Sequence, residues 1–316
     1  MLGLGGSMCM EDGIIQSATP TESLFDIPNL IGWWDFTDQA TMWTAKDLGG
    51  INPGLGTDFR SITNKSSHPD RLGNHLNGSG TSISGYNAFY NDNTGNLSTD
   101  LNYARFIATS PHGSWRYSAA KLNSSESGVA ESGIVSNANI DLQDFSFFAV
   151  IQPEAVDPGS YNRRLFWLNG KDTDGSVCTF TIAHEADDPN DVYLGIYMAD
   201  EPSPSNRLDS VHIGENVLAS KHLVSFNSGT GTNAARSYIN GVEKSQATID
   251  GDDVLTLDDN YATVMIGNTT NAFGIPGGPD SYWRGNIWEI IFYNQSLTSD
   301  QLTFVHNLIM ERHGLT

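Results

Sequence analysis

The chain has 316 residues, 37 of them acidic and 16 basic, so its formal net charge at pH 7 is −21. Such a charge repels polyphosphate, which excludes nucleic acid as a partner. Two cysteines, Cys9 and Cys178, offer no disulfide framework, and no apolar run approaches the length of a membrane span. We therefore expect a large domain that folds without disulfides in a reducing compartment and does not insert into a membrane.

Residues 1–29 form the first segment, which contains Gly, Ser and Pro with little hydrophobic periodicity. Its opening residues lack the basic and apolar regions of a secretory signal. Because chain termini become ordered when other structure ties them down, we interpret this segment as an N-terminal docking arm that packs on its own domain or on a neighbouring subunit. Residues 30–316 are then predicted to form one β-sandwich domain.

The middle of the chain is dominated by short segments with strand character, separated by turn signals. Residues 49–98, rich in Gly, Asn, Ser and Thr, are predicted to form long loops with short strands. Strands are predicted at residues 102–108, 114–120, 145–151, 164–168, 178–183, 192–198, 221–227, 235–240, 242–247 and 262–267. Many strands with almost no helix before the end of the chain indicate an antiparallel β-sandwich.

Asn-Gly pairs mark candidate hairpin turns within this region. At Asn240-Gly241, both residues accept the positive φ angles of a type I′ turn, whose twist matches that of paired strands. The flanking segments are therefore predicted to form a hairpin. Asn169-Gly170 is a second candidate turn.

The last predicted strand, residues 286–293, is apolar on both faces. Its side chains alternate between a face with Trp288, Ile290 and Phe292 and a face with Ile287, Glu289, Ile291 and Tyr293. A strand of this kind belongs in the interior, so we expect both of its faces to be covered.

A capped helix is predicted after this strand and a polar turn at residues 294–296. Thr298 is its predicted N-cap, with Gln301 as the capping-box partner. An apolar stripe at helical spacing is formed by Leu302, Val305, Leu308 and Ile309. His313-Gly314 supplies the stop signal. An ending of strand, turn and closing helix disfavours a doubly wound fold or a helical bundle.

These C-terminal segments, together with two earlier ones, resemble a known family. The residues that carry the resemblance are 283–301 and the helix as far as Gly314-Leu315, residues 30–36 at the opening strand, and residues 222–226 and 237–241 at the central hairpin. They resemble laminin-G-like, concanavalin A-like jelly-roll modules, especially those of bacteriophage and bacterial surface proteins. Such modules commonly end in a Gly, an apolar-acidic-apolar strand, Tyr-Asn, a Leu-Ser/Thr cap and a helix closing on Gly-Leu. The resemblance covers residues 30–315 and implies an all-β fold, a concanavalin A-like jelly-roll β-sandwich with a short C-terminal helix.

The resemblance to phage modules, the signal-free start and the arm together predict a non-enzymatic virion surface protein of a tailed bacteriophage, either a capsid decoration protein or a tail or adsorption module. It is expected to be assembled in the host cytoplasm, to contact other virion proteins through the arm, and to form homo-oligomers. A host-surface glycan is the expected ligand. A bacterial surface adhesion module is a further alternative. Location in head or tail and the identity of the glycan stay open, because motifs of this kind specify a fold rather than a function.

Aromatic side chains are the candidate carbohydrate-binding residues. Sugar rings present apolar C–H faces that stack on exposed indole or phenol rings. Trp115 and Tyr117 alternate on a predicted strand, and Tyr282-Trp283 follow the Gly/Pro-rich loop of residues 274–280. Because of this loop setting, Trp283 is expected to be the most exposed tryptophan, whereas most tryptophans of a sandwich lie in its core.

Residues 184–191 are the candidate segment for catalysis. Glu185 and Asp187 stand as in the Glu-x-Asp-x-x-Glu strand of laminarinase-like glycosidases on this fold, which need one nucleophilic and one proton-donating carboxyl group. Asn190 occupies the position of the third acid, and Pro189 disturbs the strand pairing that would set the spacing. We therefore interpret the segment as an acidic loop between two strands, with a laminarinase-like glycoside hydrolase as the alternative function.

Hard oxygen ligands for calcium occur at Asp250, Asp252 and Asp253, without a recognisable coordination frame. Related jelly rolls commonly bind calcium, so the resemblance implies this ion as the cofactor to consider; the alternative is that these residues make turns. The histidines show no zinc-ligand spacing. Ser225 and the two cysteines lie in no nucleophile motif, so triad-type hydrolysis is not expected.

Overall fold

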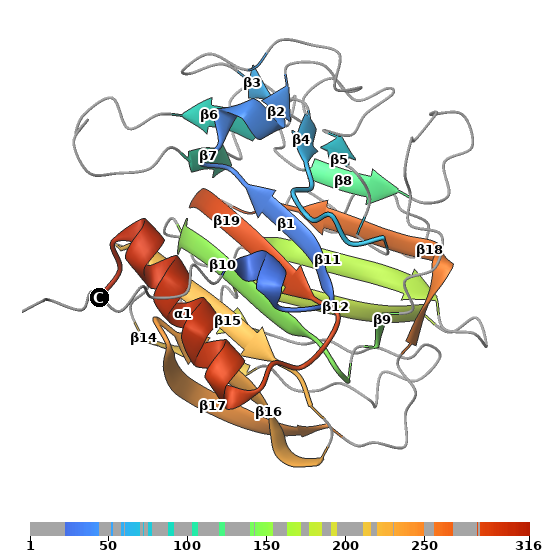
Figure 1. Cartoon of the computed structure of the whole chain (residues 1–316), viewed down its shortest axis with the longest axis vertical. Coiled ribbons are helices and arrows are strands. Elements are labelled where there is room, and N and C mark those ends of the chain that lie inside the picture. The colour runs from blue at the N-terminus through green and yellow to red at the C-terminus, as the bar shows by residue number, and fades with distance from the viewer. Residues whose placement is uncertain are drawn as a thin grey trace, which may run out of the picture.

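The computed structural model describes residues 23–43, 52, 58–59, 61–69, 72, 75–77, 88–91, 103–106, 120–123, 140–141, 143–153, 163–171, 177–184, 191–194, 211–215, 220–229, 231–249, 256–267, 283 and 285–316. These residues form two β-sheets and a C-terminal α-helix, with short 3₁₀ turns η1 (Leu24–Asp26) and η2 (Gln39–Thr41) near the start (Figure 1). The predicted all-β fold class, an antiparallel β-sandwich with a short C-terminal helix, is confirmed.

The first sheet has β10 and β19 at its centre. In spatial order it contains β17 (Val242–Ile249), β16 (Gly231–Ile239), β15 (His222–Asn227), β10 (Ser146–Pro153), β19 (Gly285–Tyr293), β7 (Tyr103–Phe106), β6 (Ala88–Asn91) and β3 (Asp58–Phe59), and β1 (Leu30–Asp35) also pairs with β19. Every described strand pair in it is antiparallel.

The second sheet faces the first. In spatial order it contains β14 (Val211–Glu215), β13 (Asp191–Leu194), β12 (Val177–His184), β11 (Arg163–Lys171), β18 (Thr256–Ile266), β8 (Ala120–Asn123), β5 (His75–Asn77), β4 (Ser61–Thr63) and β2 (Met42–Trp43), and β9 (Ile140–Asp141) also pairs with β18. Its described pairs are antiparallel too.

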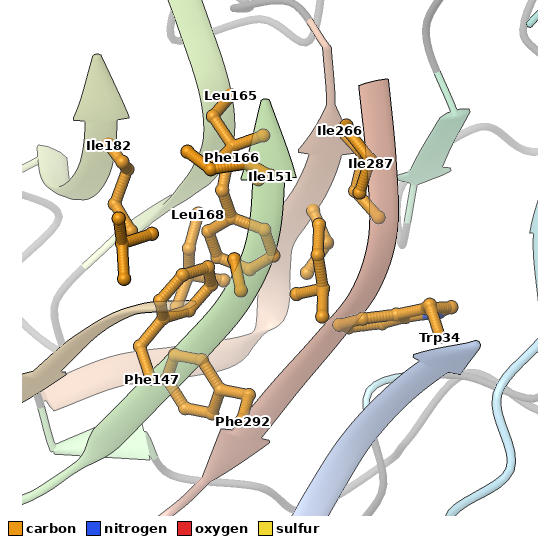
Figure 2. Close-up of a cluster of buried hydrophobic side chains, with 14 of the residues drawn as sticks. Trp34, Phe147, Ile151, Leu165, Phe166, Leu168, Ile182, Ile266, Ile287 and Phe292 are labelled. Atoms are coloured by element: carbon orange, nitrogen blue, oxygen red, sulfur yellow. The ribbon is translucent and has the colours of Figure 1, made fainter. Parts of the chain in front are cut away.

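An aromatic core fills the space between the sheets (Figure 2). Because side chains alternate along a strand, Phe147 and Ile151 of β10 point to this core. Phe147 meets Phe166 of β11 at a ring-centroid distance of 4.9 Å, and Phe145 stacks on Phe292 of β19 at 5.2 Å. Full burial of each such side chain contributes about 1.5–3 kcal/mol, so this core is a main source of the stability of the sandwich.

The outer face of the first sheet is covered by helix α1 (Ser299–His313), which lies across it (Figure 1). Phe148 and Val150 of β10, on the face opposite the inter-sheet core, share a second buried cluster with Val305 and Ile309 of α1. Strand β19 therefore lies between two apolar layers, as its sequence predicts.

A β-bulge in β19 changes which side chains face each layer. Val150 pairs with Glu289 while the next residue, Ile151, pairs with Ile287, so Trp288 is an extra residue. As a result Ile287 lies in the inter-sheet core and Trp288 lies in the cluster under α1. The predicted faces of these two residues are wrong, because one inserted residue shifts the strict alternation on which that prediction depends.

The predicted ends of the helix are confirmed. The hydroxyl of Thr298 accepts a hydrogen bond from the backbone N–H of Gln301, whose side chain accepts one from the N–H of Thr298. Gly314 ends the helix with a left-handed backbone at φ 62°. Of the predicted apolar stripe, Leu308 is only partly buried. Two polar residues of the helix, His306 and His313, are buried as well.

The two candidate Asn-Gly turns have different outcomes. Asn240 and Gly241 have φ values of 47° and 74° and join β16 to β17, so this hairpin is confirmed. The predicted turn at Asn169-Gly170 is wrong, because both residues lie inside β11. Asn169 pairs with strands on both of its sides, and this double pairing outweighs the local turn preference.

The described end of the arm, residues 23–29, packs on the sandwich. Leu24 and Ile27 are buried in the cluster under α1. The hydroxyl of Tyr293 donates to the carbonyl of Leu24 at 3.1 Å, and Asn294 N donates to the carbonyl of Asn29 at 2.8 Å. Residues 1–22, which carry the rest of the predicted arm, lie outside the described residues.

Candidate functional site

A groove of about 460 Å³ lies at one end of the first sheet. It is lined by Ser220, Lys221 and His222 at the start of β15, by Asn240 in the β16–β17 turn, and by His313, Gly314, Leu315 and Thr316 after the last turn of α1. Its volume is within the range of small-molecule pockets. Three segments that are far apart in the sequence thus meet at one concave surface.

Local hydrogen bonds hold the walls of the groove in place. The side-chain oxygen of Asn240 accepts from the N–H of Leu223 at 2.9 Å, and Asn240 N donates back to the Leu223 carbonyl at 2.8 Å, which fastens the turn to β15. At the opposite wall, the N–H of Leu315 donates to the Met310 carbonyl at 2.9 Å. This bond continues the left-handed turn at Gly314 and directs the chain along the groove.

His313 connects the groove to a buried carboxylate. Its side chain is buried, and its Nε2 lies 2.9 Å from Oε2 of Glu289, which is only 1% exposed. The other oxygen of Glu289 accepts hydrogen bonds from Nε1 of Trp33 at 2.6 Å and from Arg312 at 2.5 Å. A carboxylate only accepts, so Nε2 of His313 carries the proton that it donates. Nδ1 of His313 has no hydrogen-bond partner among the described residues.

His222 is the second imidazole of the groove. Both of its ring nitrogens are buried and have no hydrogen-bond partner in the described part of the chain. Burial lowers the pKa of His222 below its ordinary value, so the ring is neutral at pH 7. A neutral imidazole offers one N–H donor and one acceptor. The neighbouring Lys221 places its ammonium group 5.1 Å from the ring centroid of Trp288, a cation–π contact.

A Ser-His pair lies beneath α1, away from this groove. Oγ of Ser225 and Nε2 of His306 are 2.7 Å apart, and the rings of Phe148 and Tyr238 pack against His306. Burial lowers the pKa of His306 to about 4. Because Ser225 is 0% exposed, its hydroxyl cannot reach a substrate in this conformation. The pair therefore fastens the helix to β15.

The predicted exposure of Trp283 is wrong. Its indole is 1% exposed and belongs to the inter-sheet core. The backbone N–H of Trp283 donates to the carbonyl of Gly267 at 3.0 Å, which ties the residue to the end of β18. This tie, rather than the preceding Gly/Pro-rich loop, sets the position of the ring, so Trp283 cannot stack on a sugar in this conformation.

The remaining predicted site residues lie outside the described part of the chain. They are the carbohydrate-binding candidates Tyr282, Trp115 and Tyr117, the calcium candidates Asp250, Asp252 and Asp253, and the acids Glu185 and Asp187. Among the described residues, no group of three or more His, Cys, Asp or Glu side chains could hold a metal ion. No helix in the same residues is long and apolar enough to cross a membrane.

Sequence reasoning did not find the groove. His222 is visible only as the first residue of a strand, and His313 only as part of a helix stop. The acid in the last strand, Glu289, is the one sequence signal that bears on the site, because an acid on an otherwise apolar strand needs a partner. Its partners come from α1 and β1, and their positions depend on how the helix crosses the sheet.

No protein-family model and no curated protein matches the sequence. Among solved structures, the chain is similar to a Trypanosoma rangeli sialidase, with 10% identity and a TM-score of 0.44 over 95% of this chain and 36% of that chain. It is also similar to the CBM40 of a Ruminococcus gnavus IT-sialidase bound to α2,3-sialyllactose, with 13% identity and a TM-score of 0.40 over 65% of this chain and 97% of that chain. A third is a SAP-like pentraxin from Limulus polyphemus, with 15% identity and a TM-score of 0.38 over 53% of this chain and 71% of that chain. The chain thus spans about a third of the length of the sialidase, and at these scores its function is argued from its own residues.

Proposed function

We propose that the chain is a non-enzymatic, glycan-binding virion surface protein of a tailed bacteriophage, acting as a capsid decoration protein or as a tail or adsorption module. The observation that carries glycan binding is the groove lined by His222, Asn240 and His313, where three imidazole nitrogens have no hydrogen-bond partner among the described residues. Sugar hydroxyl groups both donate and accept hydrogen bonds, so they suit such a surface. The resemblance of residues 30–315 to phage jelly-roll modules supports the virion role.

The buried carboxylates of the described residues favour binding over hydrolysis. Burial alone would raise the pKa of Asp35, but hydrogen bonds from Thr37 and Lys65 outweigh it and lower that pKa. A glycosidase needs a carboxylic acid whose pKa is raised, so that it is protonated when the leaving group departs. Glu289 is held between Arg312 and His313. Asp35 is therefore not suited to donate a proton to a glycosidic oxygen, and Glu289 is 1% exposed and does not reach the surface in this conformation.

The glycan-binding part of the proposal predicts binding without cleavage. On an array of neutral and acidic glycans, we expect the purified chain to bind at least one glycan. The same protein should release no reducing sugar from that glycan or from laminarin, because binding groups and not reacting groups line the groove. A heat-unfolded sample is the control for non-specific adsorption. Release of reducing ends that disappears in the Glu185→Gln variant contradicts the proposal and supports the laminarinase-like alternative.

The virion part of the proposal predicts that the arm is needed for assembly. Deleting residues 1–22 keeps Leu24 and Ile27, which are buried in the domain, so the sandwich should still fold. We expect the truncated protein to retain glycan binding but to be absent from purified particles, as measured by mass spectrometry of virions from cells that express either form. Normal incorporation of the truncated form removes the role of the arm. Absence of the full-length chain from particles argues for the bacterial adhesion alternative.

A further inference from the structure

The groove lacks the carboxylate side chains that a calcium site prefers. Its lining residues include no Asp or Glu side chain. Calcium takes six to eight oxygen ligands and prefers carboxylates, and the ammonium group of Lys221 at one wall repels a cation. The lining therefore offers no carboxylate pair to hold a calcium ion between a sugar and the protein.

His313 is prepared as a hydrogen-bond acceptor. Its Nε2 donates to Glu289, and the imidazole tautomer that carries its proton on Nε2 has its lone pair on Nδ1. This atom is buried without a partner among the described residues, and a buried polar atom in that state is costly. A ligand hydroxyl or N–H that donates to Nδ1 removes this cost.

The other groups of the groove complement this acceptor. His222 presents a neutral imidazole with one donor and one acceptor. Asn240 accepts from Leu223 N through its side-chain oxygen, so its NH₂ group is directed to other partners as a donor. Donors and acceptors that lie near one another match the neighbouring hydroxyl groups of a pyranose, each of which can donate and accept.

We propose that the groove binds a neutral sugar without calcium, and that binding moves the walls of the groove enough for a sugar hydroxyl to donate a hydrogen bond to Nδ1 of His313, which is buried in this conformation. This inference rests on the proposed glycan-binding function and specifies its site and ligand class. The choice of a neutral sugar follows from the net charge of −21, because a surface this acidic repels acidic glycans at long range.

The test titrates the intact protein with galactose, glucose, N-acetylglucosamine and N-acetylneuraminic acid, each in EDTA and in calcium. Calorimetry gives Kd, and long-range ¹H–¹⁵N NMR spectra of the wild-type protein report the hydrogen bonding of His313 Nδ1. His313→Gln keeps a donor for Glu289 but lacks the Nδ1 acceptor, and His222→Phe removes both ring nitrogens. His68→Phe is the matched control, because His68 is half-buried and does not line the groove. Circular dichroism checks the fold of each variant.

We expect a neutral sugar to bind equally in EDTA and calcium and to shift the Nδ1 signal of His313. Both groove variants should raise Kd by about tenfold or more, the effect of losing one hydrogen bond to a buried group, while the control leaves it unchanged. Binding that EDTA abolishes, binding of the acidic sugar alone, or a folded His222→Phe variant with wild-type affinity overturns the inference and leaves glycan binding intact. Failure to bind any sugar here or on the array overturns both proposals.

Discussion

Replacing Glu289 with glutamine is expected to lower the free energy of unfolding by about 3 kcal/mol, because it removes the charge that accepts hydrogen bonds from Arg312 and His313, and each hydrogen bond to a charged group contributes about 1.5–3 kcal/mol. Glu289 is 1% exposed and accepts hydrogen bonds from Trp33 of β1 and from Arg312 and His313 of α1. Glutamine has nearly the same shape but no charge. The substitution therefore changes the electrostatics of the site with little change in packing. Denaturant unfolding at pH 7 measures the resulting change in the free energy of unfolding.

An exposed ion pair of the same chain supplies the control. Oε2 of Glu243 lies 3.2 Å from Nη1 of Arg236, and the two side chains are 33% and 46% exposed, respectively. Exposed pairs contribute about 0–1 kcal/mol, so Glu243→Gln should change stability by no more than that. Equal losses in the two variants would show that Glu289 does not hold α1 on the sheet.

The second large effect is expected on acidification, through His306. Burial lowers its pKa from 6.5 to about 4 in the folded chain. Between these values the unfolded chain binds a proton that the folded chain does not, so stability is highest above pH 6.5 and falls as the pH decreases toward 4. A shift of this size corresponds to about 3 kcal/mol. Below pH 4 both states are protonated and this contribution no longer changes.

Comparison with His306→Gln separates this contribution from that of the many carboxylates. Denaturant unfolding of both proteins from pH 4 to 7 should show that the wild type loses stability relative to the variant as the pH falls. Ser225→Ala keeps His306 but removes its hydroxyl partner. Since burial is the cause of the shift, this variant should retain the pH dependence of the wild type. If the difference in unfolding free energy between the wild type and His306→Gln does not change with pH, His306 is not the source of the acid sensitivity.

Local patterns predict much of this fold. The capping box at Thr298, the stop at Gly314 and the Asn240-Gly241 turn depend on neighbouring residues and backbone angles, and all three are confirmed. The burial of β19 on both faces also follows from its own side chains. Such features need no knowledge of distant parts of the chain.

Features that depend on distant segments could not be predicted. The bulge at Trp288 is visible only in the register of β19 with β10, and the burial of Trp283 depends on a backbone bond to Gly267. The groove needs the β16–β17 turn and the end of α1 to meet at β15. These segments are separate in the sequence, so no short stretch of it predicts their contact. The candidate site could be identified only from the tertiary structure.

The pairing of β1 with β19 has a consequence for how the molecule forms. Trp33 and Glu289 are 256 positions apart, yet they belong to adjacent strands near the middle of the first sheet. Closing so long a loop has a large entropic cost and tends to slow folding. Until residues 285–293 leave the ribosome, β1 and β10 each keep an edge without its neighbour, and such edges associate readily with other chains. The sheet can therefore be completed only after residues 285–293 have been synthesised, and until then the open edges of β1 and β10 favour association with other chains.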